Sequence, residues 1–257
     1  MRLLIKLGGT LLDAAGSRDR LAREITQAAA EGNHKIVVVH GGGKQMTRFL
    51  AERGVESHFI KGLRVTTPEV IDAVVKVFAG SVNTSLVAAF RAAGALPVGL
   101  TGLDAGLVDA VIRNPELGQV GKPTRSDPRI LELLTGAGYL PVVACVAGDA
   151  GGAIYNVNAD QMAAACAAAF HADKLLFLTD VEGVRDAEGQ TLPVLTSGEA
   201  LGLIRSGVAT GGMQAKLEAA VEALQGAVGE VLIAPGAHHN IVDSLLAGRP
   251  AGTQLVA

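Results

Sequence analysis

The stretch KIVVVHGGGKQMTRFL, residues 35–50, decides the fold class. A short apolar run ends at His40, three glycines follow, and apolar residues at helical spacing begin near Gly43. The same order of a continuous Val/Ile/Leu run and a longer helical segment recurs along the chain. This order is typical of stacked βαβ units around a mainly parallel sheet. We therefore expect an α/β fold, a three-layer αβα sandwich with a central mainly parallel sheet.

The expected elements follow from the same pattern. Continuous apolar runs predict buried strands at 3–7, 35–40, 96–100, 141–145, 175–179 and 230–234. Helical spacing predicts helices at 18–31, 43–53, 68–79, 82–93, 128–136, 160–170, 212–225 and 241–247. Residues 106–124 and 180–194 break the alternation and are expected to form hairpins, flaps or surface loops. One domain, 1–257, is expected, with two lobes that divide near residue 171.

The composition limits the classes of partner. Hydrophobic residues make up 49% and charged residues 18%, which supports a large core, and the net charge is −3. That balance predicts binding to neither nucleic acid nor an anionic membrane. There is no run of about 18 apolar residues for a membrane span, and Lys6 interrupts the short apolar N-terminus, so we expect a cytoplasmic protein. Cys145 and Cys166 lack metal-ligand spacing, and no metal-ligating residue is predicted.

Two predicted strands end in residues suited to binding an anion. Lys6 precedes Gly8 and Gly9, and His40 precedes the glycines at 41–43 and a helix. Glycine lets the backbone approach a ligand closely, and the N–H groups at the start of a helix can bind an anion. A tight structural turn is the alternative explanation. There is no GxGxxG after a strand and no GxxxxGK[ST], which disfavours a dehydrogenase and a P-loop enzyme.

The segment YNVNAD, residues 155–160, places three polar side chains at every second position. In an extended chain Asn156, Asn158 and Asp160 point to one face, where two amides and a carboxylate would converge. Asp160 as the N-cap of the next helix is the alternative. A cap explains Asp160 but neither asparagine, so a site is favoured.

Two cations lack an obvious local explanation. Lys216 lies between the apolar stripe and the polar face of its predicted helix, and no residue three or four positions away can pair with it. It suits a phosphate ligand, with snorkelling to solvent as the alternative. Arg64, in the segment 61–66, could bind a carboxylate through two hydrogen bonds, or be an ordinary surface arginine.

Taken in order, five motifs resemble the amino-acid kinase family, and within it the acetylglutamate kinases most closely. The motifs are the segments 6–9, 40–43, 62–66, 156–160 and 211–213 with Lys216. Residues 213–216 read Met-Gln-Ala-Lys where the family often has Met-Ile-Pro-Lys, but the spacing of the lysine is kept. The resemblance covers nearly the whole chain.

The resemblance implies roles for individual residues. Three would be catalytic, two lysines that balance the charge of the transferred phosphoryl group and a carboxylate that holds them: Lys6, Lys216 and Asp160. Five would bind the substrate: Gly42, Gly43, Arg64, Asn156 and Asn158. The two lysines would also contact the nucleotide, together with Gly8, Gly9, Asp180, Gly211, Gly212 and Met213.

The implied activity is ATP-dependent phosphorylation of the side-chain carboxylate of N-acetyl-L-glutamate, the second step of arginine biosynthesis. A carboxylate is already ionised at neutral pH, so no general base is needed. ATP would act with Mg²⁺, and no tightly bound prosthetic group is expected. Residues 1–170 would bind the substrate and dimerise, and residues 171–257 would bind ATP. A homodimer is expected, and a nitrogen-signalling regulator remains a candidate partner.

Two alternatives stay open from the sequence. One is a kinase for aminoadipate or glutamate attached to a carrier protein in lysine or arginine synthesis. The other is a non-catalytic member of the fold that binds a nucleotide or a metabolite.

Overall fold

The computed structural model describes residues 1–32 and 34–257 and is built on one eight-stranded sheet, in the order β12-β14-β13-β11-β1-β2-β8-β5. All six predicted strands are confirmed and run parallel: β1 (Arg2–Leu7), β2 (Lys35–His40), β5 (Pro97–Thr101), β8 (Leu140–Ala144), β11 (Lys174–Thr179) and β13 (Glu230–Pro235). At one edge β14 (Thr253–Val256) runs antiparallel to β13, and β12 (Val194–Thr196) pairs with β14.

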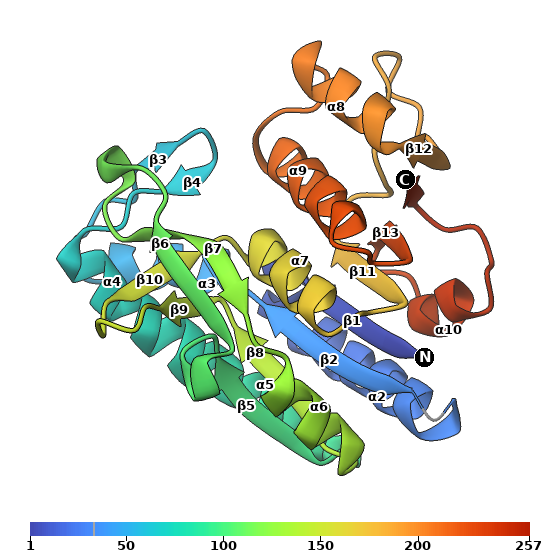
Figure 1. Cartoon of the computed structure of the whole chain (residues 1–257), viewed down its shortest axis with the longest axis horizontal. Helices are drawn as coiled ribbons and strands as arrows, with labels where there is room; N and C mark the ends of the chain where they lie inside the picture. Colours follow the sequence, from blue (N-terminus) through green and yellow to red (C-terminus); the bar gives the residue numbers. More distant parts are fainter. Residues whose placement is uncertain (33) are drawn as a thin grey trace.

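Helices cover both faces of this sheet, which confirms the three-layer arrangement (Figure 1). On one face α7 (Ala159–Ala169) packs against β1, β2 and β11, and beside it α9 (Gly211–Gln225) packs against α7 and β13. On the other face α2 (Ala15–Glu31) packs against α5 (Asn83–Ala92), which also contacts β5 and β8. The strands are continuous apolar runs because both of their faces are buried.

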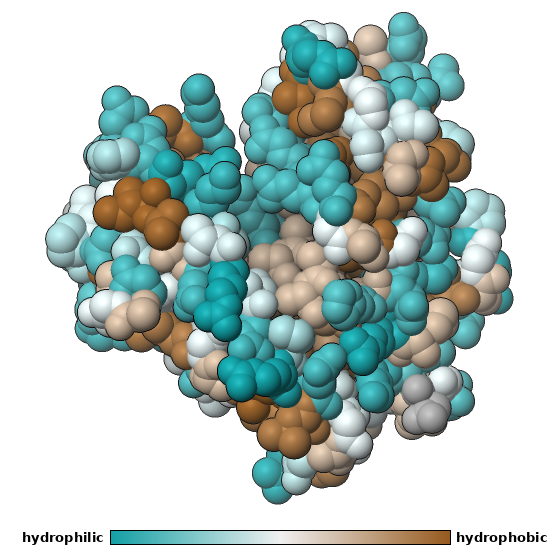
Figure 2. Space-filling model, in the orientation of Figure 1, coloured by the Kyte–Doolittle hydropathy of each residue, from teal (hydrophilic) through white to brown (hydrophobic). Residues whose placement is uncertain are grey.

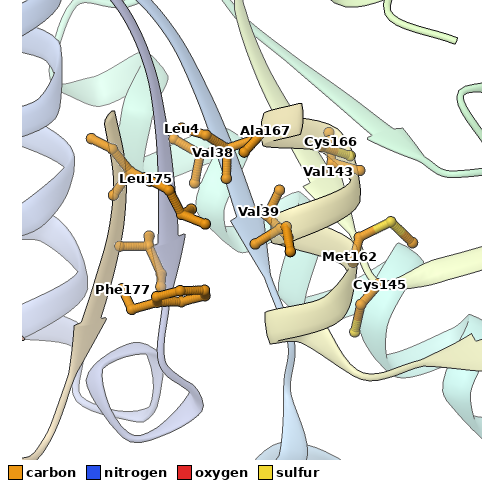
Figure 3. Close-up of a cluster of buried hydrophobic side chains, with 14 of the residues drawn as sticks. Leu4, Val38, Val39, Val143, Cys145, Met162, Cys166, Ala167, Leu175 and Phe177 are labelled. Carbon is orange, nitrogen blue, oxygen red and sulfur yellow. The ribbon is translucent and has the colours of Figure 1, made fainter. Parts of the chain in front are cut away.

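The core between the sheet and α7 explains why that helix is rich in alanine. Figure 3 shows Met162, Cys166 and Ala167 of α7 facing Val38, Val39 and other side chains of the strands. All of these residues are buried. Small side chains bring the helix axis close to the sheet, and the first turn of α7 thereby comes close to the end of β1.

Residues 68–92 form one continuous helical segment, which differs from the two helices predicted at 68–79 and 82–93. An α-helix, α4 (Pro68–Val74), continues into a π-helical stretch at Val75–Val82 and then into α5. By length and composition these 25 residues could cross a membrane, although no membrane span was expected from the sequence. However, 44% of the apolar window is buried inside the protein, and a core helix passes the same test.

The remaining helices agree with the prediction in part. Those expected near 43, 128 and 241 are confirmed as α3 (Gly43–Ala51), α6 (Arg129–Gly136) and α10 (Ile241–Leu246). Two were missed, α1 (Gly9–Asp13) and α8 (Ser197–Arg205). The start of α8 has a capping box between Thr196 and Glu199, a sequence signal that could have revealed it.

Two hairpins stand beside the main sheet. The hairpin expected within 106–124 is confirmed as β6 (Val108–Ile112) and β7 (Val120–Ser126), and both strands join a closed ring with β9 (Val146–Gly148) and β10 (Ile154–Val157). A second hairpin pairs β3 (Phe59–Ile60) with β4 (Leu63–Arg64). The segment 180–194 is largely loop, and an antiparallel bridge joins Arg185 to Thr191 as expected of a hairpin.

Candidate active site

Three charged side chains meet at the carboxyl edge of the sheet. Lys6 comes from the end of β1, Asp160 from the first turn of α7, and Lys216 from the second turn of α9. Lys6 Nζ lies 2.7 Å from Asp160 Oδ1, and Lys216 Nζ lies 3.0 Å from Asp160 Oδ2. The exposed fractions of the three residues are only 8%, 6% and 6%. The structure therefore brings together all three residues that the sequence singled out as catalytic.

The Lys6–Asp160–Lys216 cluster has a net positive charge because one carboxylate faces two ammonium groups. Burial would raise the pKa of Asp160, but Lys216 and Lys6 outweigh that effect and hold it at about 2. Burial lowers the pKa of Lys216 to about 8, although Asp160 favours its charged form. Lys216 Nζ also lies 5.2 Å from the centre of the Phe177 ring. A buried cluster with one excess positive charge favours an anionic ligand.

A cavity of about 210 Å³ opens beside Lys6. Its walls include the glycine-rich turn after β2, the β3–β4 hairpin and the end of β10, and they bring together the predicted residues Gly9, Gly42, Gly43, Arg64, Asn156 and Asn158. A Cβ atom on Gly42 would lie 2.9 Å from Cδ1 of Phe78, so a larger residue would collide there. No backbone acceptor is found for the N–H groups of Gly42 and Gly43 among the residues described. Both groups are therefore available to a ligand.

Arg64 is a buried cation in the wall of this cavity. Its guanidinium donates to Thr47 Oγ1 at 2.8 Å, to the carbonyl of Gly43 at 3.2 Å, and to Ser57 Oγ. Burial lowers the pKa of Arg64, and none of the ion pairs in the described ranges involves it. The neutral partners fix its direction and leave its charge uncompensated. This arrangement fits a carboxylate ligand and excludes the alternative of an ordinary surface arginine.

The two asparagines differ from the sequence expectation. Asn158, rather than Asp160, is the N-cap of α7, and its Oδ1 accepts from the backbone N–H groups of Asp160 and Gln161. Asn156 donates from Nδ2 to Thr66 Oγ1 at 3.0 Å. Both line the cavity, whereas Asp160 turns to the lysines. The helix starts at Ala159 and ends the alternation of side chains, so the three polar groups do not share one face.

The residues expected to bind nucleotide fall into two groups. Gly8 and Gly9 follow β1, and Asp180 follows the adjacent β11, where its carboxylate accepts from Thr10 Oγ1 at 2.9 Å. Asp180 is also close enough to Lys216 to favour its charged form. Gly8, Gly9 and Asp180 thus lie at the same edge of the sheet as the cluster.

Gly211, Gly212 and Met213 form the first turn of α9, beyond the cavity beside Lys6. Gly211 has φ +54° and lies next to the hairpin, since a Cβ atom on Gly62 would be 3.5 Å from the carbonyl carbon of Gly211. Gly211 also lines a separate cavity of about 390 Å³ with Lys61 and Arg113. Figure 2 shows a notch in the molecular surface between the β3–β4 hairpin and helices α8 and α9.

Sequence reasoning missed a buried pair behind the glycine-rich turn. His40 is fully buried, and burial lowers its pKa to about 4 despite its hydrogen bond to Gly41. Its ring contacts Asn83 of α5. Asn83 lies among other polar residues, Ser81, Thr84 and Ser85, so the sequence carried no signal that distinguished it. Cys145 was also missed as a lining residue; burial raises the pKa of its thiol to about 12, which makes it unreactive.

The arrangement suits charge stabilisation more than acid–base or metal chemistry supplied by the protein. It offers Lys6, free backbone N–H groups and an oriented arginine around one cavity, and Asp160 joins Lys216 to Lys6. Within residues 1–32 and 34–257 no group of three or more His, Cys, Asp and Glu side chains could hold a metal ion. Transfer of a phosphoryl group between anions needs mainly positioning and compensation of negative charge.

Comparisons with known proteins agree with this chemistry. The model of the "Amino acid kinase family" matches residues 1–235. The acetylglutamate kinase of Solibacter usitatus is 60% identical over 256 residues, covering 100% of this chain and 99% of that protein. The acetylglutamate kinase of Acidobacterium capsulatum is 42% identical over 261 residues, covering 100% of both.

A solved structure shares the fold of this chain over its full length. The N-acetylglutamate synthase of Neisseria gonorrhoeae, in complex with coenzyme A and N-acetyl-glutamate, is 26% identical with a TM-score of 0.87. The similarity covers 100% of this chain and 59% of that one. From the matching family model, the full-length relatives and the cluster at the sheet edge, the chain belongs to the amino acid kinase family.

Proposed function

We propose that this protein is an ATP-dependent kinase that phosphorylates the side-chain carboxylate of N-acetyl-L-glutamate, the second step of arginine biosynthesis. The observation that carries the proposal is the Lys6–Asp160–Lys216 cluster beside a cavity whose arginine has no carboxylate partner among the described residues. The acetylglutamate kinases at 60% and 42% identity support it.

The reaction assigns a task to each group. Arg64 binds one carboxylate of the substrate, and the other carboxylate attacks the γ-phosphorus of ATP. As the new O–P bond forms, the bond to the β–γ bridging oxygen breaks and ADP leaves with the electron pair. Lys6, Lys216 and the N–H groups of Gly42 and Gly43 surround the oxygens on which negative charge develops.

Asp160 acts through the lysines. Without an anion between them, Lys6 and Lys216 would repel each other in a buried site. The carboxylate favours the charged form of Lys216 and forms ion pairs with Lys6 and Lys216 at 2.7 and 3.0 Å. Because the attacking carboxylate is already ionised near pH 7, no side chain has to remove a proton.

ATP would bring Mg²⁺ to the site, since the described residues offer no ligand cluster of their own. The ion would neutralise part of the phosphate charge. Gly8, Gly9, Asp180 and the first turn of α9 form the nucleotide side of the proposal. Residues 1–170 would bind the substrate and dimerise, and residues 171–257 would bind ATP. A homodimer in the cytoplasm completes the proposal, and light scattering would test the dimer.

The decisive assay measures ATP turnover with Mg²⁺ and traps the acyl phosphate with hydroxylamine. N-acetylglutamate is compared with glutamate, aspartate and 2-aminoadipate. We expect a hydroxamate from N-acetylglutamate alone, lost in Lys6→Met and Lys216→Met. Lys174→Met is the matched control, because Lys174 also forms an ion pair, with Glu230 at 2.6 Å, but lies at the opposite end of its strand. Product from 2-aminoadipate alone, or from none of the four compounds, would contradict the proposal.

A further inference from the structure

His40 is held in one protonation state by two partners. Its Nδ1 lies 2.8 Å from the carbonyl oxygen of Gly41, and its Nε2 lies 2.9 Å from Asn83 Nδ2. A carbonyl only accepts, so the hydrogen is on Nδ1, and Nε2 accepts from the amide. The orientation of the Asn83 amide is itself fixed, because Nδ2 also donates to the carbonyl of Val142 at 2.9 Å. The ring is therefore neutral, with its hydrogen directed at Gly41.

This hydrogen bond fixes the direction of the next backbone N–H. In a trans peptide the C=O and the N–H point in opposite directions, and the described residues contain no cis peptide bond. The carbonyl of Gly41 and the N–H of Gly42 belong to the same peptide. Because His40 draws that carbonyl toward the buried side, the N–H of Gly42 points the other way, on the side of the cavity that Gly42 lines.

The helical segment 68–92 packs behind the glycine-rich turn and contacts both Gly42 and His40. Its π-helical stretch ends at Val82, immediately before Asn83, and places Phe78 and Val82 within 3.2 Å of where a Cβ atom on Gly42 would be. Gly99 of β5 makes room for the amide, since a Cβ atom there would lie 2.2 Å from Asn83 Oδ1. One irregular helix thus backs the glycine turn and supplies the partner of His40. Such π-helical irregularities are frequent at functional sites.

We infer that His40 and Asn83 are positioning residues that aim the Gly42 N–H at the phosphoryl group in transfer. Neither residue touches the substrate; both act through the peptide between Gly41 and Gly42. The inference rests on the proposed function for the identity of the reaction. A donor fixed before the substrate arrives needs no reorganisation during the reaction.

The test compares three variants. Asn83→Leu removes the donor that holds Nε2 in place, so the ring can turn and its Nδ1–H is no longer held toward the Gly41 carbonyl. His40→Leu removes the bond to Gly41, whereas His40→Asn keeps a donor near the position of Nδ1. We expect the two leucine variants to lower kcat about 10–100-fold, less than the 10²–10³-fold loss of a whole donor. We expect both KM values to change less than about threefold, since the contact acts in the transition state.

Two further variants separate positioning from general damage. His40→Asn should recover most of the kcat lost in His40→Leu. Ser85→Ala is the matched control, because Ser85 lies on the same helix and, among the described residues, its hydroxyl donates only to the carbonyl of Val82. We expect it to leave kcat unchanged. Unchanged kcat in Asn83→Leu, or equal loss in folded His40→Asn and His40→Leu, would overturn the inference.

A readout independent of activity separates this inference from the proposed function. ¹⁵N NMR of the ring should show hydrogen on Nδ1 of His40 in the unaltered protein and a shift of that Nδ1 resonance in Asn83→Leu, because the hydrogen bond from Nδ1 to Gly41 weakens. Hydrogen exchange at the Gly42 amide should accelerate in the same variant. If N-acetylglutamate gives no product but these shifts occur, the proposed function fails and the positioning stands. If the ring and the amide are the same in both proteins, the positioning is wrong whatever the substrate.

Discussion

Replacing Asp160 by asparagine tests the cluster most directly. Asp160→Asn keeps the shape of the side chain but removes the one negative charge between Lys6 and Lys216, which lie 2.7 and 3.0 Å away. Breaking a buried ion pair by removing one partner costs about 3–5 kcal/mol. For a chain of this size each kcal/mol lowers Tm by about 2–4 °C. We therefore expect Tm to fall by roughly 6–20 °C.

Activity should fall for the same electrostatic reason. Without Asp160 the two ammonium groups repel each other, and Lys216, whose pKa burial already lowers, should lose its proton near neutral pH. We expect kcat to fall at least about 10²-fold, because charge compensation and the position of both lysines are lost together. Calorimetry measures the first effect, and hydroxamate formation measures the second.

A double-mutant cycle provides the refutation. Lys216→Met removes one cation with little change in length, so Asp160→Asn combined with Lys216→Met leaves a single buried charge, on Lys6. The combined variant should be more stable than the sum of the two separate losses predicts, by about 1–3 kcal/mol. Strictly additive losses, or a Tm for Asp160→Asn within 2 °C of the unaltered protein, would refute the reasoning.

Three further predictions concern the Lys6–Asp160–Lys216 cluster and the cavity beside Lys6. Because burial lowers the pKa of Lys216 to about 8 in the protein without substrate, kcat/KM should fall as pH rises through about 8, and a profile of kcat/KM flat to about pH 9.5 would contradict this. Gly42→Ala places a Cβ 2.9 Å from Phe78 and should cost about 1–3 kcal/mol on thermal denaturation, whereas Gly43→Ala, with nothing within 4 Å, serves as the stability control and should cost under about 0.5 kcal/mol. Arg64→Lys should raise KM for N-acetylglutamate about 10–100-fold and leave KM for ATP unchanged, because an ammonium cannot make the paired hydrogen bonds of a guanidinium; equal effects on both substrates would argue against its role.

The local signals in the sequence were sufficient for the six parallel strands of the sheet and pointed to Asp160 and Lys216, whereas the expected catalytic roles came from the resemblance to the amino-acid kinase family. Continuous apolar runs mark strands that are buried on both faces, so all six parallel strands were predicted. Lys216 stood out because no residue of its own helix could pair with it. The structure shows that it pairs with Asp160, which lies on another helix. The other two strands of the main sheet, β12 and β14, are short. The apolar run of β12 is too brief to be distinguished from the loop before it.

The sequence by itself determined the order of the elements and which residues carry unexplained charge. Only the tertiary structure decided how those charges pair and which polar residue caps a helix. Spacing along the chain placed Asn158 and Asp160 on one face, yet α7 begins between them and turns Asp160 toward the lysines. The contact between His40 and Asn83 joins residues 43 positions apart. Such contacts depend on how the layers pack, and no local pattern records that packing.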